Sequence, residues 1–341
     1  MQHLPKPILT LILGQIQFSA RRVCRRWKQV IDQIFTFDQC DLHRIIRGST
    51  ASILRMFLSR TIVYSYTSGF GVIIACETKK KWAVRALAKY LPKNFNWDYA
   101  LYTACVGGDM GIVREILKHR VDYSFGLSGA CVGGHFEIYQ FFRSFGVQPV
   151  SLYDACRGGN EKIIRDLGCE DWEEGFIGAC EGGHIWILRE FLPKIQPSEG
   201  FFLEAICAAV GQCNLPITRI DGPIRQCETV KFLLEIAGPI QLTECFRRAC
   251  ECGHESVCEL MLRHDPFTRV LLSGPERKNA NRHGVENLWP GFVAACVAGR
   301  ENIVRLIVAQ GRLSEFSLRL GANVAFQHQH YGIYRFLIEG W

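Results

Sequence analysis

The chain has 341 residues, of which 48% are hydrophobic, and its formal net charge at pH 7 is +7. A chain of this length and apolar content can bury a large core, which excludes an intrinsically disordered protein. The positive charge is weaker than the bias typical of nucleic-acid-binding domains, so we expect no nucleic-acid partner.

Residues 1–40 differ in pattern from the rest of the chain. They begin with Leu4-Pro5, continue with the apolar pair Ile8-Leu9, and later reach Val23-Cys24-Arg25-Arg26-Trp27. This order resembles the F-box family, which opens with Leu-Pro, has an Ile-Leu helix and reaches Val-Cys-Arg-x-Trp in a later helix. The resemblance implies docking of an apolar helical face on the Skp-family adaptor of a cullin ubiquitin ligase. The implied docking or core positions are Leu4, Pro5, Ile8, Leu9, Val23, Cys24 and Trp27.

Two alternatives stay open for this N-terminal segment. Pro7 stands where the F-box family usually has an acidic residue, and the stretch between Leu13 and Val23 is a few residues short. The segment could therefore be a cap, because a stacked-repeat domain needs a covering helix at its end. It could also be a secretory signal peptide with Ile8 to Leu13 as its apolar core, although the charge that ordinarily precedes such a core is nearly absent.

From residue 41 onward, one short phrase returns at a nearly regular spacing. The clearest copies begin at Ala104 (ACVGGDMGIVREIL), Ala130, Ala155, Ala179, Ala249 and Ala295, and weaker copies begin at Ile45, Ala75, Ala205 and Ala325. About ten copies of a unit of about 25 residues predict a solenoid, a domain of stacked repeats. We expect this solenoid to fill residues 41–341.

Each copy predicts two short helices joined by a tight turn. Four copies have a helix-capping residue six or seven positions before the first alanine: Asp98, Ser124, Ser198 and Thr243. The Gly-Gly pair supplies the left-handed backbone that ends the first helix. The second helix has apolar residues at helical spacing, such as Ile112, Val113 and Ile116. We therefore expect an all-α fold in which stacked hairpins cover one another's apolar faces.

The repeated phrase resembles the ankyrin repeat. The family's Ala-Ala-x-x-Gly-His and its following amphipathic helix are similar to Ala130, Cys131, Gly134 and His135 with Glu137, Ile138 and Phe142. The unit is shorter than the roughly 33 residues usual for ankyrin, and no Thr-Pro-Leu-His opening occurs. The resemblance therefore implies that the protruding β-hairpin finger is reduced or lost. This Cys- and Gly-rich style is similar to that of divergent ankyrin proteins encoded by large DNA viruses of amoebae.

The sixteen cysteines raise the question of disulfide bonds. Seven of them share one repeat position: Cys76, Cys105, Cys131, Cys156, Cys180, Cys250 and Cys296. Stacked helices lie about 8–10 Å apart, so equivalent Cα atoms exceed the roughly 7 Å that a disulfide can span. We therefore predict buried, reduced thiols, which are typical of the cytosol or nucleus.

The residues Cys250, Cys252, His254 and Cys258 form the sharpest candidate metal site. However, Cys-x-Cys is not the usual spacing of a zinc site. Histidines of the repeats are replaced in other copies, because His135, His184 and His254 correspond to Asp109, Asn160 and Arg300. A shared catalytic base or metal ligand would not vary in this way, so we expect these histidines to cap the turn or the second helix.

No phosphate loop, nucleophile elbow or zinc-protease motif occurs in the sequence. We therefore expect no enzyme activity, no cofactor and no bound metal. No run reaches the roughly 18 apolar residues that cross a membrane, so we also expect no membrane contact. These expectations favour a location in the cytoplasm, which is the host cytoplasm if the source is viral, or in the nucleus.

Two insertions interrupt the repeats, near residues 211–227 and 265–290. Extra residues in a solenoid usually emerge as loops, often on the binding face, although such loops also drift without function. The candidate partner contacts in these insertions are Asp221, Arg225, Arg269, Arg277, Lys278 and Arg282.

Together these patterns predict an adaptor that does no chemistry of its own. The N-terminal segment would hold the Skp-family adaptor, and the solenoid would hold an unidentified target protein. Tethering would raise the concentration of the target at the ligase. The alternative is a binding scaffold with no link to ubiquitin, in which the N-terminal segment is only a cap.

Overall fold

The computed structural model describes Ile46 and residues 65–148, 151–168, 171–211, 222–237, 242–263 and 288–339. Within these ranges the secondary structure consists of helices and turns without a strand, which confirms the predicted all-α fold there. The chain divides into two compact units between Phe95 and Asn96. The F-box-like segment and, apart from Ile46, the weak copy at Ile45 lie outside the described residues. None of the described helices is long and apolar enough to cross a membrane.

In the first unit, α5 (Ser65–Glu77) and α6 (Lys81–Ala88) pack together as one helical hairpin. Lysines replace the Gly-Gly pair in its turn, yet the turn keeps its geometry. Lys79 adopts the left-handed conformation with φ of 55°. The Nζ of Lys80 donates a hydrogen bond of 2.6 Å to the backbone carbonyl of Ile46.

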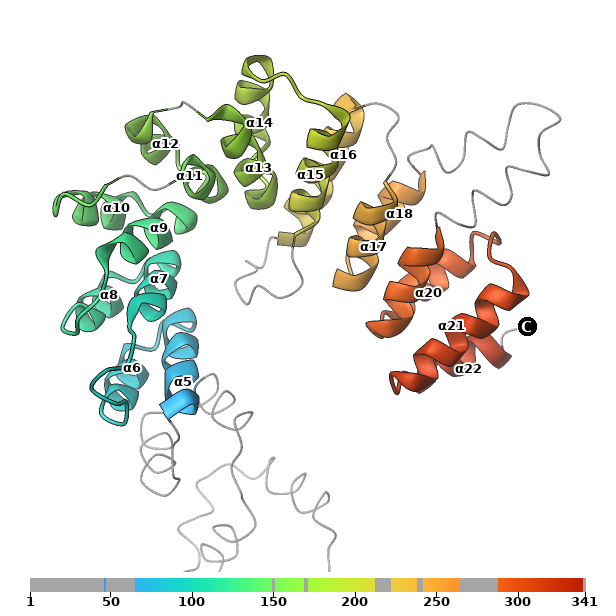
Figure 1. Ribbon diagram of the computed structural model, residues 1–341, viewed down its shortest axis with the longest axis horizontal. Helices are drawn as coiled ribbons and strands as arrows, with labels where there is room; N and C mark the ends of the chain where they lie inside the picture. The colour runs from blue at the N-terminus through green and yellow to red at the C-terminus, as the bar shows by residue number, and fades with distance from the viewer. Residues whose placement is uncertain are drawn as a thin grey trace, which may run out of the picture. The chain divides into compact units, whose positions relative to one another are not determined.

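The second unit repeats this hairpin along the chain (Figure 1). The first helices of its hairpins are α7 (Asp98–Gly107), α9 (Tyr123–Gly133), α11 (Leu152–Gly158), α13 (Trp172–Gly182), α15 (Glu199–Val210), α17 (Thr243–Cys252), residues 288–297 and α21 (Glu315–Gln327). The second helices are α8 (Met110–Ile116), α10 (Phe136–Arg143), α12 (Glu161–Leu167), α14 (Ile185–Phe191), α16 (Gly222–Ala237), α18 (Glu255–Arg263), α20 (Glu301–Val308) and α22 (Tyr331–Glu339), and a 3₁₀ turn (η2, Leu192–Lys194) follows α14.

Successive hairpins of the second unit stack through their first helices. Each first helix from α7 to α17 packs against the next first helix along the chain. From α7 to α18, each second helix also packs against the first helix of its own hairpin. This sequential packing is the arrangement of a helical repeat protein.

The two glycines of the turn have different roles. The second glycine ends the first helix in the left-handed conformation, as predicted, with φ of 68° at Gly134 and 74° at Gly183. The first glycine instead permits close contact between repeats. A Cβ atom on Gly158 would overlap the carbonyl oxygen of Cys131 in the preceding repeat. The sequence predicts the turn but not this contact.

The capping prediction is right at one of its four positions. The Ser198 hydroxyl caps α15 by accepting a hydrogen bond of 3.2 Å from the Phe201 N–H. The prediction is wrong at Asp98, Ser124 and Thr243, which lie inside the first turn of their helices rather than before it.

At α9 the cap is Asp122 instead of Ser124. The Asp122 carboxylate accepts a hydrogen bond of 2.9 Å from the Ser124 N–H, and this bond lowers the pKa of Asp122. The Asp98 carboxylate accepts a bond of 2.8 Å from the backbone N–H of Asp122. Asp98 therefore links its own repeat to the next one.

In several repeats the residue that follows the turn connects its hairpin to the preceding one, whereas Asp109 at this position caps its own helix α8 by accepting a hydrogen bond from the Ile112 N–H. The histidine contacts are His135 Nε2 to Val106 O (3.1 Å), His184 Nε2 to Arg157 O (3.1 Å) and His330 Nε2 to Val297 O (3.0 Å). Other donors at this position are Arg300 Nε to Glu251 O (3.1 Å) and Asn160 Nδ2 to Gly134 O (2.9 Å). Because the His135 and His184 side chains do not cap α10 and α14, the prediction that they cap the second helix is wrong at these two residues. His, Asn, Arg and Lys interchange here because all of them donate an N–H.

The repeat cysteines are buried and form no disulfide bond, as predicted. Cys76, Cys105, Cys131, Cys156, Cys180, Cys250 and Cys296 are each buried thiols. Burial raises the pKa of the Cys131 thiol to about 12. Such thiols act as small apolar side chains between stacked helices.

The described parts of the predicted insertions are helical. Residues 222–227 belong to α16, and residues 288–290 belong to a first helix. The predicted loop boundaries are therefore wrong at these ends, because a proline such as Pro223 is tolerated in the first turn of a helix. Arg225 lies within α16, whereas Asp221, Arg269, Arg277, Lys278 and Arg282 lie outside the described residues.

Candidate functional site

Two hollows in the surface of the second unit lie between neighbouring first helices. The first has a volume of about 310 Å³ and is lined by side chains of α7 and α9. The second has a volume of about 500 Å³ and is lined by residues of α11, α13, α15 and α17 and by Gly211. We call this surface the first-helix face, defined by Tyr99, Tyr102, Phe125, Ser128, Tyr153, Glu181, Glu204, Cys207, Glu244, Cys245 and Arg248.

The first hollow is aromatic. Tyr99 and Phe125 each lie five residues before the first alanine of their repeat, on the helix side opposite the buried Leu101 and Leu127. Tyr99 is 47% exposed and Phe125 is 41% exposed. The rings of Tyr99 and Tyr102 stack with centroids 5.9 Å apart. Stacking therefore presents rigid aromatic surface to solvent, which is the kind of surface that anchors protein interfaces.

Polar side chains continue the first-helix face from α9 to α13. Ser128 Oγ donates a hydrogen bond of 2.5 Å to Asp154 Oδ2. Burial raises the pKa of Asp154, and the bond from Ser128 opposes this rise. Tyr153 donates its hydroxyl to Glu181, which also pairs with Arg157 at 2.9 Å. These contacts cross from one repeat to the next and fix the side chains between the two hollows.

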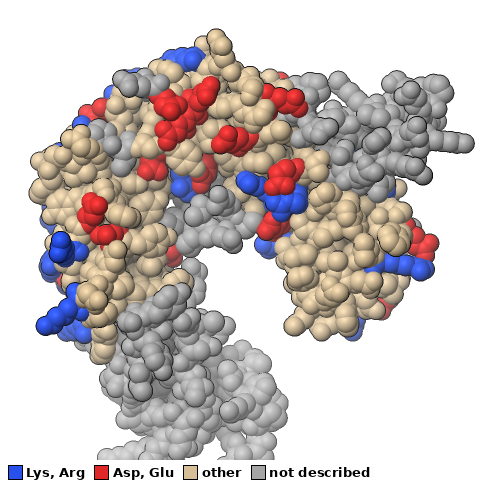
Figure 2. All heavy atoms as spheres, viewed as in Figure 1, with Lys and Arg blue, Asp and Glu red and all other residues tan. Residues whose placement is uncertain are grey.

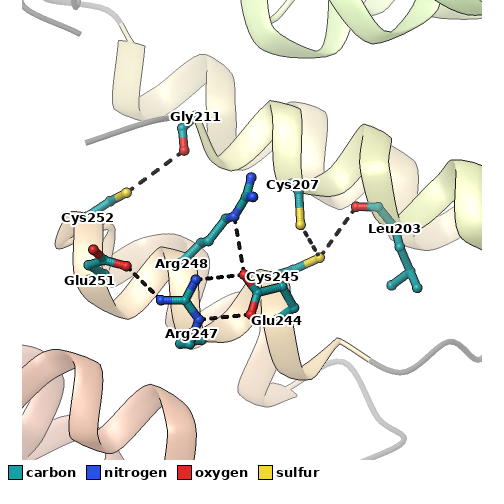
Figure 3. A network of polar contacts seen from close by, with 9 residues as sticks. All are labelled: Leu203, Cys207, Gly211, Glu244, Cys245, Arg247, Arg248, Glu251 and Cys252. Carbon is teal, nitrogen blue, oxygen red and sulfur yellow. Dashed lines mark hydrogen bonds and ion pairs between the residues drawn. The ribbon is translucent and has the colours of Figure 1, made fainter. Parts of the chain in front are cut away.

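The second hollow has a charged rim on α17 (Figure 3). Arg247 donates to both oxygens of Glu244, at 2.7 and 2.8 Å, and to Glu251 at 2.8 Å. The bonds from Arg247 hold the pKa of Glu244 below its usual range. Arg248 Nε lies 3.4 Å from Glu244. Because exposed ion pairs add little to stability, their main effect here is to orient Glu244 and Arg248 beside the hollow.

Acidic side chains gather on the same part of the second unit. Figure 2 shows Asp and Glu in red over the region of α13 to α15. Glu181 and Glu204 of this region line the second hollow with Glu244. The first-helix face thus changes from aromatic at α7 and α9 to charged at α13 to α17.

The candidate metal site is not assembled in the structure. The Sγ atoms of Cys250 and Cys258 lie 3.7 Å apart and are buried. His254 bonds instead to the backbone of Val210, and burial lowers its pKa. Among the described residues, no group of three or more His, Cys, Asp and Glu side chains could hold a metal ion.

Cys252 differs from the other described cysteines because it is disulfide-bonded. The prediction of reduced thiols is therefore wrong at this residue, which does not occupy the shared repeat position. Its Sγ lies 3.9 Å from the Gly211 carbonyl oxygen. Since a disulfide sulfur has no proton to donate, this distance is a packing contact.

The sequence-predicted contacts and the observed hollows do not coincide. The F-box-like residues Leu4, Pro5, Ile8, Leu9, Val23, Cys24 and Trp27 lie outside the described residues. The side chain of Arg225 also lies outside them, although its backbone is part of α16. The insertion loops were the predicted contact region, whereas the hollows lie on the first helices. Large apolar residues at one exposed repeat position, such as Tyr99 and Phe125, are the signal that could have indicated this face.

No protein-family model matches this chain, and comparison with curated proteins gives no match either.

Proposed function

We propose that this chain is a protein-binding adaptor whose first-helix face takes a segment of a target protein. The observation that carries the proposal is that both hollows lie between first helices. Their linings combine exposed aromatic rings with oriented charged groups. Such a combination is typical of interface centres, where a few aromatic and arginine side chains contribute most of the binding energy.

The repeats are best described as divergent ankyrin-like repeats without long fingers. Support comes from the Gly-Gly turns and from the short connections between hairpins. Residues 117–122 join α8 to α9 without a strand. A target would therefore contact helix surfaces rather than hairpin fingers.

The N-terminal segment gives the adaptor its second partner. Its resemblance to the F-box supports docking on the Skp-family adaptor of a cullin ubiquitin ligase, in the cytoplasm. The target held on the first-helix face would then meet the ligase at a high effective concentration. A scaffold without a ubiquitin link is the second candidate, and it shares the same target-binding face.

Peptide selection tests the binding face. A phage-displayed library of random dodecapeptides is selected on the full chain, and the affinities of the enriched peptides are measured by fluorescence polarisation. We expect Phe125→Ser to weaken binding by about tenfold or more, as for an aromatic anchor. Trp186→Ser is the matched control, because Trp186 is also 41% exposed but lies on α14, a second helix.

The control should change the affinity by less than about twofold, which is within the range of surface positions outside an interface centre. If Trp186→Ser abolishes binding while Phe125→Ser leaves it unchanged, the target-binding surface is on the second helices and the proposal fails.

A further inference from the structure

We propose that Cys207 and Cys245 are a redox modification site, at which oxidised glutathione or a similar small disulfide forms a reversible disulfide bond. The two Sγ atoms lie 3.1 Å apart (Figure 3). A disulfide has an S–S length of about 2.05 Å, so closure requires the sulfur atoms to approach by about 1 Å. This proposal does not depend on the identity of the target protein.

The pair bridges two consecutive repeats rather than two equivalent positions. Cys207 lies in α15, and Cys245 lies near the start of α17, against which α15 packs. Equivalent cysteines of neighbouring repeats lie too far apart for a disulfide, but this limit does not apply to Cys207 and Cys245, which occupy different repeat positions. Cys245 Sγ also lies 3.6 Å from the Leu203 carbonyl oxygen, which keeps it directed toward α15.

Access distinguishes the two thiols. Both residues line the second hollow, but Cys207 is half-buried and Cys245 is fully buried. The contact with the Cys245 thiol lowers the pKa of Cys207, and Arg248 acts in the same direction. The contact with Cys207 and burial raise the pKa of Cys245. Cys207 is therefore the attacking thiol, since the thiolate is the nucleophile, and Cys245 is the resolving thiol.

The reaction is two successive thiol–disulfide exchanges. The Cys207 thiolate attacks one sulfur of oxidised glutathione, which forms a mixed disulfide and releases one glutathione thiolate. Cys245 transfers its proton to that thiolate and attacks the Cys207 sulfur, which releases the second glutathione as a thiolate. This second thiolate takes up from water the proton that Cys207 gave to water when its own thiolate formed. The protein loses two electrons and two protons, and one oxidised glutathione becomes two reduced molecules.

The chain contains a matched control pair. Cys250 and Cys258 have Sγ atoms 3.7 Å apart, and both are buried. Neither is among the residues that line the second hollow. Burial and the contact with Cys258 raise the pKa of Cys250. Proximity alone would oxidise both pairs, whereas a site that depends on access through the hollow oxidises only Cys207 and Cys245.

The test is disulfide mapping of the full chain after reduction and equilibration with mixtures of oxidised and reduced glutathione. A Cys213→Ser background is used, because Cys207 and Cys213 share the tryptic peptide 195–219, whereas peptide 232–247 carries Cys245 as its one cysteine. We expect the linked peptides 195–219 and 232–247 to accumulate as the oxidised fraction rises and to separate when reduced glutathione is restored. Cys250 and Cys258 should stay available for alkylation.

Two variants test the order of attack without requiring the disulfide to form. Cys245→Ser should trap glutathione on Cys207, and Cys207→Ser should leave Cys245 unmodified. Circular dichroism checks that both variants keep their helices. The proposal is overturned if no Cys207–Cys245 link forms at any glutathione ratio, if Cys252 takes the place of either partner, or if Cys250 and Cys258 oxidise equally readily.

Discussion

Replacing Gly158 by alanine is expected to lower the free energy of unfolding by about 3 kcal/mol, the upper part of the range for overpacking. The added Cβ would overlap the carbonyl oxygen of Cys131 and lie 2.9 Å from the backbone nitrogen of Gly134. Both neighbours are backbone atoms, so neither can rotate away. The two consecutive repeats that contain α9 and α11 would therefore have to move apart. Urea unfolding followed by circular dichroism measures the change.

Gly200→Ala is the control for this prediction. Gly200 lies in the first turn of α15, and a Cβ there would meet nothing closer than Ser198 Oγ at 3.8 Å. Alanine favours a helix over glycine by up to about 1 kcal/mol, so this variant should be neutral or slightly stabilising. Equal destabilisation by both substitutions would show that close contact between repeats is not what requires glycine at Gly158.

Phe142→Ala is expected to lower the free energy of unfolding by about 3–5 kcal/mol, as for other buried phenylalanines. Phe142 is fully buried in α10 and packs against Gly126 of α9 in the same hairpin. The missing Cβ of Gly126 makes the space for this ring, since a Cβ there would lie 2.7 Å from Phe142 Cε1. Truncating the ring leaves a cavity between the two helices.

A double-mutant cycle directly tests the packing of the Phe142 ring against Gly126. Gly126→Ala alone should destabilise the hairpin, because the new methyl group collides with the ring. In a Phe142→Leu background the same substitution should be much less harmful, since the shorter side chain leaves room for the methyl group. Additive effects of the two substitutions would contradict the packing of Phe142 on Gly126.

The sequence predicts the helical hairpin because the signals for it are local. The Gly-Gly pair and the spacing of Ile112, Val113 and Ile116 depend only on residues within one repeat. The contact of Gly158 with the preceding repeat and the hydrogen bond from His184 to Arg157 depend on how repeats stack. No local pattern specifies that stacking, so the sequence alone predicts neither role.

The candidate site was harder to predict than the fold. The insertions are visible in the sequence as breaks in the period, whereas the residues that line the hollows are spread over several repeats. The second hollow combines residues from Tyr153 to Arg248, which come together only when four first helices are placed side by side. The approach of Cys207 to Cys245, which are 38 residues apart, likewise follows from packing and not from spacing.

The most direct test of the adaptor proposal is gel filtration of the full chain with a Skp-family adaptor and a fluorescein-labelled peptide from the library selection. We expect one peak that contains all three components. Trp27→Glu should release only the Skp-family adaptor, and Phe125→Ser should release only the peptide. If the peptide elutes with the chain but the Skp-family adaptor never does, the link to ubiquitin is wrong and the scaffold is the better account.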